Sequence, residues 1–299
     1  MPETNLPVTN TLITVLEILK KAAEDLDKNK IMDARLNAEL ILCNVMNCKR
    51  IDLYVNYEKP LNPHEETEFN RLINRRISKE PLQYILGKTN FFGYDIIVDK
   101  NVLIPRQETE LLVERILEDI SATEKKAVSF FEIGTGSGCI VAALAKKLIE
   151  QNISYEIFSI DISEKALDTA TKNMELNGIT GKDITLFCKD VFEIPKLKKN
   201  YDYIVSNPPY VSNNDWKKLP DEIRNYEPKN ALTDGDNGLS FYNKIFEIFM
   251  DAEFKGKLFC EIGYGQKESI ESLLKKNDVK KFIFYRDYSN IYRILKAEK

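Results

Sequence analysis

Histidine is nearly absent from this sequence, and long apolar runs are missing altogether. The single histidine among 299 residues is His64, which lies in a charged stretch beside Pro63 and Glu65. We therefore expect chemistry that uses neither a histidine base nor a bound metal ion. No stretch approaches the roughly 20 apolar residues that a membrane span requires, so we expect no membrane association. The first residues lack the basic flank and apolar core of a secretory signal, which predicts a cytoplasmic protein.

Paired cysteines and an excess of basic charge are lacking as well. The five cysteines form an odd set without a CxxC pair, so we expect reduced thiols rather than disulfides or a zinc site. The net charge is −4. This balance argues against nucleic acid as a partner, because proteins that bind a duplex usually present a basic face.

Length and residue patterns predict a small and a large domain. Residues 1–81 place apolar side chains at helical spacing and contain no glycine, which predicts a small helical bundle. Residues 82–104 predict a linking β-hairpin, since aromatic and β-branched residues flank Gly93. Residues 105–299 are expected to form the larger domain.

Three helices are expected in the small domain. The first should begin near Leu12, with Asn10 or Thr11 as its cap. The second and third are expected over residues 34–42 and 65–78, where apolar residues recur on one face.

The larger domain alternates helical stretches with short apolar strands. Such alternation predicts an α/β fold with a seven-stranded, mainly parallel, Rossmann-like sheet and helices on both faces. The last two strands lie close together in the sequence and predict an antiparallel hairpin. The expected strands are residues 128–132, 155–160, 184–188, 203–206, 257–262, 281–285 and 291–295.

A glycine-rich segment joins the first expected strand to an apolar helix over residues 139–149. It reads Gly134-Thr135-Gly136-Ser137-Gly138. Glycines let the backbone turn sharply and approach a ligand, and free amides at the helix start can hold a carboxylate. The G-x-G-x-G spacing differs from the G-x-G-x-x-G of dinucleotide-binding loops. By itself this glycine loop also fits a tight strand-to-helix turn, so its role as a cofactor loop depends on its neighbours.

Acidic residues follow the next two strands. Asp161 ends the second strand and can accept hydrogen bonds from both hydroxyls of a ribose. Asp190 follows the third strand and can accept from an adenine amino group, with Val191 covering the ring. Each acid alone could be a helix cap or a loop residue. Together with the glycine loop they outline one adenosine across the carboxyl edge of the sheet, where open α/β sheets bind ligands.

The fourth strand ends in the most specific motif of the sequence, Asn207-Pro208-Pro209-Tyr210. A proline-stiffened turn after a strand is common. That interpretation does not explain why an amide, two prolines and an aromatic ring meet at the same edge as the glycine loop.

Methyl transfer to a planar nitrogen explains this motif. An amide nitrogen is a poor nucleophile, because its lone pair is delocalised, and to attack a sulfonium methyl group the lone pair must point along the CH3–S axis. The side-chain oxygen of Asn207 and the carbonyl of Pro208 could impose this geometry and stabilise the charge that develops on the nitrogen. Rigid prolines improve the positioning, and the Tyr210 ring could pack against the planar acceptor. No strong base is needed, because the proton can leave after the transfer.

The glycine loop, the two aspartates and the Asn-Pro-Pro-Tyr motif together resemble class I methyltransferases that act on nitrogen. Further segments narrow the resemblance to the bacterial release factor glutamine methyltransferases, the HemK/PrmC family, and extend it over nearly the whole chain. Gln107 departs from the family pattern, which usually has proline there. The segments that carry the narrower resemblance are residues 33–35, 38–42, 86–87, 91–93, 103–110, 227–232 and 261–263.

The resemblance implies an S-adenosyl-L-methionine-dependent enzyme. Its substrates would be class 1 peptide chain release factors, methylated at the side-chain amide nitrogen (N5) of the glutamine in their GGQ motif. The helical domain would help dock this protein substrate, and the hairpin would help form the cleft. The sequence does not define the oligomeric state, and a monomer is expected.

The resemblance also implies roles for individual residues. Asn207 and Pro208 would be catalytic, and with Pro209 and Tyr210 they would hold the glutamine. The cleft wall could include Arg106 and Glu108, although a helix-start salt bridge or cap fits these two equally well. The residues expected at the cofactor, from the motifs and the resemblance, are Gly134, Thr135, Gly136, Ser137, Gly138, Asp161, Asp190, Val191 and Asn207.

Other acceptors and a non-catalytic role also have to be weighed. A ribosomal-protein glutamine methyltransferase shares the motifs and the mechanism, and the N-terminal domain favours the release factor type. DNA adenine and RNA guanine methyltransferases use a similar motif, because an exocyclic amine poses the same geometric problem, but they need a phosphate-binding surface. The acidic charge balance argues against them. A binding module without activity is the third alternative, and the complete set of pocket residues argues against it.

Overall fold

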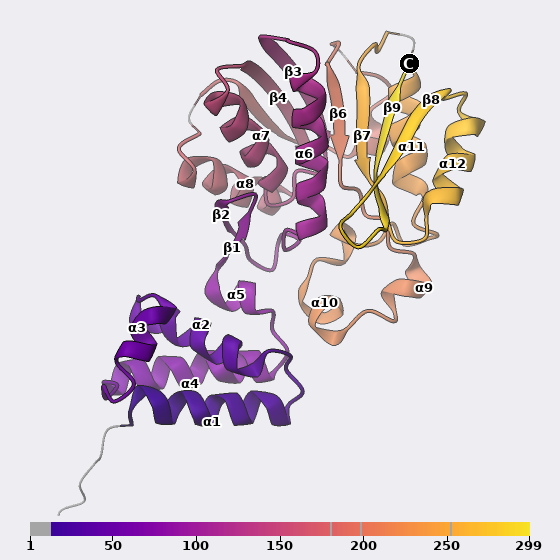
Figure 1. The fold of residues 1–299 in the computed structure, drawn as a ribbon. Helices are drawn as coiled ribbons and strands as arrows, with labels where there is room; N and C mark the ends of the chain where they lie inside the picture. Colours follow the sequence, from indigo (N-terminus) through magenta and orange to yellow (C-terminus); the bar gives the residue numbers. More distant parts are fainter. Residues whose placement is uncertain (1–12, 180, 198, 252) are drawn as a thin grey trace, which may run out of the picture. The chain divides into compact units, whose positions relative to one another are not determined.

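The computed structural model describes residues 13–299 except 180, 198 and 252, and the chain divides into two compact units (Figure 1). The first unit extends to Leu86, and the second runs from Gly87 to Lys299. Among the described residues, no helix combines the length and apolar character needed to cross a membrane.

The first unit is helical, as predicted. Phe69, Leu42 and Leu19 are fully buried in its core. Its helices are α1 (Val15–Lys28), α2 (Ala34–Met46), α3 (Arg50–Val55), α4 (Pro63–Ile77) and α5 (Leu82–Leu86).

Two capping boxes fix the starts of the longer helices. Thr14 accepts a hydrogen bond from the Glu17 amide and caps α1, and Asn62 accepts from the Glu65 amide and caps α4. The cap of α1 is therefore Thr14. The residues proposed for that role, Asn10 and Thr11, and also Leu12, lie outside the described part of the chain.

The segment from Leu82 to Leu86 was expected to belong to the hairpin, and that expectation is wrong because the segment forms α5. Ile85 is buried in the core of the first unit, and Leu82 and Leu86 pack against that core. Burial on a helical surface outweighs the strand preference of the aromatic and β-branched residues here.

The hairpin itself consists of β1 (Lys88–Phe91) and β2 (Tyr94–Ile97), which pair antiparallel. Phe92 and Gly93 form the turn with positive φ angles of 53° and 85°, as a two-residue type I′ connection requires. Asn173, from α8 (Glu164–Leu176), holds the hairpin from the side. Its Oδ1 accepts from the Ile97 amide at 2.7 Å, and its Nδ2 donates to the Ile97 carbonyl at 2.9 Å.

A seven-stranded sheet forms the second unit, with strand order β5-β4-β3-β6-β7-β9-β8. The first five strands of this order are parallel to one another, and β9 runs antiparallel to both β7 and β8. This confirms the predicted mainly parallel sheet with an antiparallel pair at the end of the chain. The strands are β3 (Ala127–Ile133), β4 (Ser154–Asp161), β5 (Ile184–Cys188), β6 (Tyr203–Ser206), β7 (Lys257–Glu261), β8 (Lys281–Arg286) and β9 (Tyr292–Glu298).

Helices cover both faces of this sheet (Figure 1). Phe131, Ile204 and Leu258 point from neighbouring strands into one apolar core with residues of α11 and α12. The helices α6, α7 and α8 pack elsewhere on the sheet, through contacts with β4, β5, β7 and β9. The remaining helices of this unit are α6 (Gln107–Ser121), α7 (Cys139–Glu150), α9 (Asn213–Trp216), α10 (Asp221–Tyr226), α11 (Ser240–Met250) and α12 (Lys267–Lys276), with short 3-10 turns at Val191–Glu193 and Lys229–Ala231.

Candidate active site

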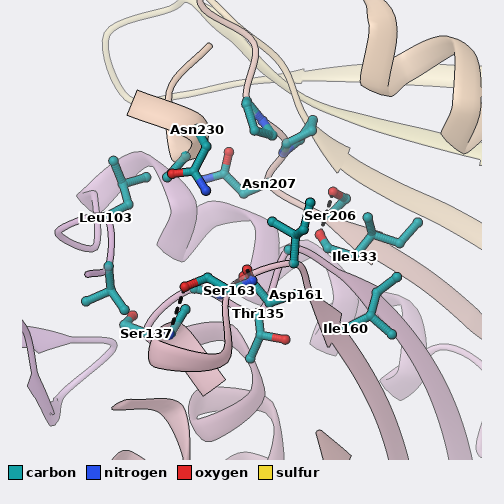
Figure 2. Close-up of a pocket in the computed structure, with 18 of the residues that line it drawn as sticks. Leu103, Ile133, Thr135, Ser137, Ile160, Asp161, Ser163, Ser206, Asn207 and Asn230 are labelled. Atoms are coloured by element: carbon teal, nitrogen blue, oxygen red, sulfur yellow. Dashed lines mark hydrogen bonds between the residues drawn. The ribbon is translucent and has the colours of Figure 1, made fainter. Parts of the chain in front are cut away.

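The carboxyl ends of β3, β4, β5 and β6 meet around one cavity of the second unit. Figure 2 shows side chains at the ends of β3, β4 and β6 around it. Two predicted residues, Gly138 and Tyr210, are not among its lining residues. The predicted residues that line it are Gly134, Thr135, Gly136, Ser137, Asp161, Asp190, Val191, Asn207, Pro208 and Pro209.

The glycine loop is tied to the end of β4. The Gly134 amide donates to the Ile160 carbonyl at 2.8 Å, and the Gly136 amide donates to Asp161 Oδ2 at 2.8 Å. The other oxygen of Asp161 accepts from the Ser163 amide at 2.9 Å. Burial raises the pKa of Asp161, and the Gly136 and Ser163 amides oppose that rise. Asp161 is therefore held in place while it lines the cavity.

Glycine residues keep the loop close to the ligand space and to the fourth strand. Gly134 and Gly136 have φ angles of +87° and +53°, where other residues are strained. A Cβ on Gly136 would meet no atom within 4 Å, and a Cβ on Gly134 would lie 3.8 Å from the carbonyl oxygen of Asn207. The loop and the Asn-Pro-Pro motif thus face each other, as the sequence predicted.

Gly138 has a packing role. It is the N-cap of α7 with φ +74°, and a Cβ there would lie 2.9 Å from the Cβ of Ala170 on α8. The Asn173 Nδ2 also donates to the Ser137 carbonyl at 2.8 Å, so α8 packs directly under the loop.

We expect Gly138→Ala to destabilise the protein more than Gly136→Ala does. Both variants force alanine into the left-handed region, at a cost of about 1–2 kcal/mol. Only Gly138→Ala adds a steric clash with α8, which costs about 1–3 kcal/mol more. Urea unfolding without added ligand measures the difference. Equal losses in the two variants would show that α8 yields freely at this contact.

Asp190 and Val191 form the part of the cavity that follows β5. Asp190 Oδ1 accepts from the Phe192 amide at 2.9 Å and so caps the 3-10 turn. Val191 is buried in the core of the sheet and still lines the cavity. Asp190 thus combines the cap role with a place beside the cavity, two roles that the sequence left as alternatives.

Asn207 lines the cavity directly after β6, and its amide is already engaged on one side. Its Nδ2 donates to Thr109 Oγ1, in the first turn of α6, at 3.1 Å. The Thr109 hydroxyl in turn donates to Glu261 Oε2, at the end of β7, at 2.6 Å. Sequence reasoning did not assign these two partners, although Glu261 is a charged residue between the apolar neighbours Cys260 and Ile262.

Tyr210 is turned toward the same carboxylate. Its hydroxyl donates to Glu261 Oε1 at 3.0 Å, and burial with the nearby carboxylate raises the pKa of this phenol well above its ordinary value. Its packing against an acceptor group therefore stays a prediction.

Glu132 is a further buried acid that the sequence analysis did not single out. It lies two residues before Gly134, the first residue of the glycine loop, and the Ser159 hydroxyl donates to its Oε2. The other oxygen, Oε1, has no hydrogen-bond partner among the described residues. Burial raises the pKa of Glu132 to about 8. A charged residue between the apolar residues Phe131 and Ile133 of this strand was the available signal.

Of the two residues considered for the cleft wall, Arg106 and Glu108, only the first lines the cavity. Arg106 lines the cavity, and its Nη2 pairs with Glu227 Oε1 at 2.6 Å. Glu227 is buried and also accepts from the Ile104 amide at 3.3 Å. Glu108 is exposed and does not line the cavity.

The residues present suit a nucleoside that carries a charged side chain. Asp161 offers carboxylate oxygens for hydroxyl donors, and the space over Gly136 is open to a ligand. Apolar lining by Ile162, Ala166 and Val191 suits a flat base. S-adenosylmethionine has these parts, and its methyl donor is a sulfonium group.

Comparisons with known proteins agree with this geometry. Residues 17–87 match the PrmC N-terminal domain, and residues 106–225 match the methyltransferase small domain. A release factor glutamine methyltransferase of Thermodesulfovibrio yellowstonii is 39% identical over 88% of this chain and 91% of its own length. One from Geobacter sulfurreducens is 36% identical over 94% of this chain and 95% of its own.

A solved structure shares the fold at low sequence identity. The catalytic domain of hMettl16, in complex with an RNA hairpin, matches with a TM-score of 0.54 at 18% identity. The match covers 78% of this chain and 80% of that chain. At this identity the likeness concerns the methyltransferase fold alone.

Proposed function

Because the chain belongs to the family of release factor glutamine methyltransferases, we propose that it methylates the side-chain amide nitrogen (N5) of the glutamine in the GGQ motif of class 1 peptide chain release factors. The observation that carries this assignment is the single cavity that joins the glycine loop to the Asn207-Pro208-Pro209 turn. The methyl donor of this enzyme is S-adenosylmethionine, which supplies an electrophilic methyl group.

Asn207 and Pro208 are the proposed catalytic pair. The Asn207 Oδ1 and the Pro208 carbonyl accept hydrogen bonds from the NH2 group of the substrate glutamine. Two acceptors on the nitrogen turn its lone pair toward the methyl group and stabilise the positive charge that grows on it. The proton then leaves to solvent, so no strong base is required. Pro209 and Tyr210 complete the proposed glutamine site.

The cofactor is proposed to lie along the other lining residues. Asp161 holds the ribose hydroxyls, Asp190 accepts from the adenine amino group, and Val191 covers the ring. The glycine loop and Asn207 line the remainder. Gly138 contributes through the packing of α7 on α8 rather than through contact.

The helical unit is proposed to bind the body of the protein substrate, and the β1–β2 hairpin to shape the entrance to the cleft. This division agrees with the match of residues 17–87 to the PrmC N-terminal domain. We further propose that the enzyme acts as a monomer in the cytoplasm.

A parallel methylation assay tests the proposed function. Methyl-labelled S-adenosylmethionine is offered with a purified class 1 release factor, with ribosomal protein, and with nucleic acid. We expect label on the release factor alone, and none on a release factor whose GGQ glutamine is replaced by asparagine. Label on ribosomal protein instead would establish the runner-up substrate, and label on nucleic acid would overturn the assignment to a protein acceptor.

A further inference from the structure

Glu261 is a buried carboxylate that the methyl-transfer chemistry does not use directly. It ends β7 with 1% of its surface exposed. Both of its oxygens are engaged, since Oε2 accepts from the Thr109 hydroxyl at 2.6 Å and Oε1 accepts from the Tyr210 hydroxyl at 3.0 Å. Burying a charge is costly unless the charge is hydrogen-bonded, and these two hydroxyl groups meet that need for Glu261.

The donors and acceptors of Glu261, Thr109 and Asn207 determine which group donates in each of their hydrogen bonds. An ionised carboxylate has only acceptors, so the single hydroxyl proton of Thr109 is committed to Glu261. The Thr109 oxygen then offers only a lone pair to Asn207. The Asn207 amide must therefore present its NH2 group to Thr109, as the 3.1 Å contact from Nδ2 shows.

We propose that Thr109 and Glu261 are positioning residues that select the orientation of the Asn207 amide, with NH2 toward Thr109 and Oδ1 toward the nitrogen to be methylated. This inference rests on the proposed role of Asn207. The orientation that this role requires is set by Thr109 and Glu261, which do not touch the reacting atoms.

A hydrogen-bonding partner has to select the orientation of the Asn207 amide, because the shape of the side chain does not. The oxygen and the NH2 group of an asparagine side chain are nearly the same size, so a half-turn about the Cβ–Cγ bond changes the packing little. It exchanges acceptor for donor, however. A reversed Asn207 would present NH2 to the NH2 of the substrate, and the hydrogen bond that aims the lone pair would be lost.

Ionisation of Glu261 is the condition for this direction. Burial raises its pKa to about 7, hydrogen bonds from Thr109 and Tyr210 oppose the rise, Arg293 lowers the pKa and Glu108 raises it. Tyr242 and Cys260 also interact electrostatically with this carboxylate. A protonated Glu261 could donate to Thr109 and free the Thr109 proton for Asn207. The methyl-transfer rate should therefore fall as the pH drops through about 7.

Two variants of Thr109 provide the matched test. Thr109→Val keeps the shape and removes the hydroxyl, whereas Thr109→Ser keeps the hydroxyl. We expect kcat to fall about 10- to 100-fold in Thr109→Val and to stay within about threefold of wild type in Thr109→Ser. In both, the KM for the acceptor protein and the Kd for S-adenosylmethionine should change less than about twofold, because Thr109 lines the cavity and neither replacement adds bulk to its wall.

The controls separate this proposal from a structural role and from the proposed function. Thermal unfolding is measured for each variant. A wild-type kcat in Thr109→Val, an equal loss in Thr109→Ser, or a loss confined to Kd would overturn the proposal. Failure of the wild-type enzyme to label a release factor would instead refute the proposed function, and the Thr109 pair would then be compared on the acceptor that the parallel assay identifies.

Glu261→Gln keeps the proposal testable if Thr109→Val does not fold. An amide here cannot ionise, so the variant should lose the fall in rate below pH 7 that wild type shows. A pH profile in Glu261→Gln with the same acid limb as wild type contradicts the proposal.

Discussion

We expect an Asn207→Ala variant to lose methyl transfer by at least about 100-fold while it still binds S-adenosylmethionine. Removing one preorganised polar group that faces developing charge costs on the order of 10²–10³ in rate in other enzymes. In this protein the Asn207 amide is held by its hydrogen bond to Thr109. No neighbouring group can therefore take the place of the missing oxygen without moving. Single-turnover transfer of labelled methyl gives the rate, and calorimetric titration gives the Kd of the cofactor.

Asn214→Ala is the matched control for this experiment. Asn214 lies seven residues later, in α9, and its side chain is exposed. It should retain the wild-type rate and affinity. Normal turnover by Asn207→Ala would remove the catalytic assignment, whatever the cofactor affinity proved to be.

Asp161→Ala should affect cofactor affinity rather than the methyl-transfer step. We expect it to weaken the binding of S-adenosylmethionine by about 10- to 100-fold, since hydrogen bonds to a charged group contribute about 1.5–3 kcal/mol. Two effects act together here. The ribose hydroxyls would lose their proposed acceptor, and the Gly136 and Ser163 amides would lose the carboxylate that holds them at 2.8 and 2.9 Å. At saturating cofactor the rate of methyl transfer should recover in large part.

Asp168→Ala is the control for that measurement. Asp168 is exposed on α8, seven residues after Asp161, and does not line the cavity. Its Kd should equal that of wild type. An unchanged Kd in Asp161→Ala would mean that the ribose lies elsewhere.

Much of the second unit could be predicted from the sequence because its signals are local. Strand β6 has the predicted bounds, and β3 and β4 each extend beyond them by a residue at either end. Parallel strands bring their carboxyl ends to one edge, so residues as distant as Gly134 and Asn207 could be placed together without coordinates.

The partners of Asn207 could not be predicted in the same way, because no local pattern joins them. Thr109 lies 98 residues before Asn207 and 152 residues before Glu261. Their meeting depends on how α6 packs beside β7, which spacing along the chain does not encode. For the same reason the hydrogen bond of Tyr210 with Glu261 was missed, although the motif that contains Tyr210 was the strongest signal in the sequence.

The short helix α5 shows a second limit of local reasoning. Only Tyr84 and Ile85 in it favour a strand, and the neighbouring hairpin was predicted correctly from the same kind of signal. What decides between the two is the apolar core that Ile85 enters, and that core is made by α1, α2 and α4 together.

Asn173 bonds to two chain segments that are far apart in sequence, and this links their motions. One side chain bonds both the amide and the carbonyl of Ile97 in the hairpin and the carbonyl of Ser137 in the glycine loop. The hairpin cannot swing away from α8 unless it breaks two of these bonds and frees an amide that also steadies the loop. A protein that displaced the hairpin would therefore strain the same side chain that bonds the loop, in addition to the bonds of the hairpin with Glu110, Glu150 and Asn177.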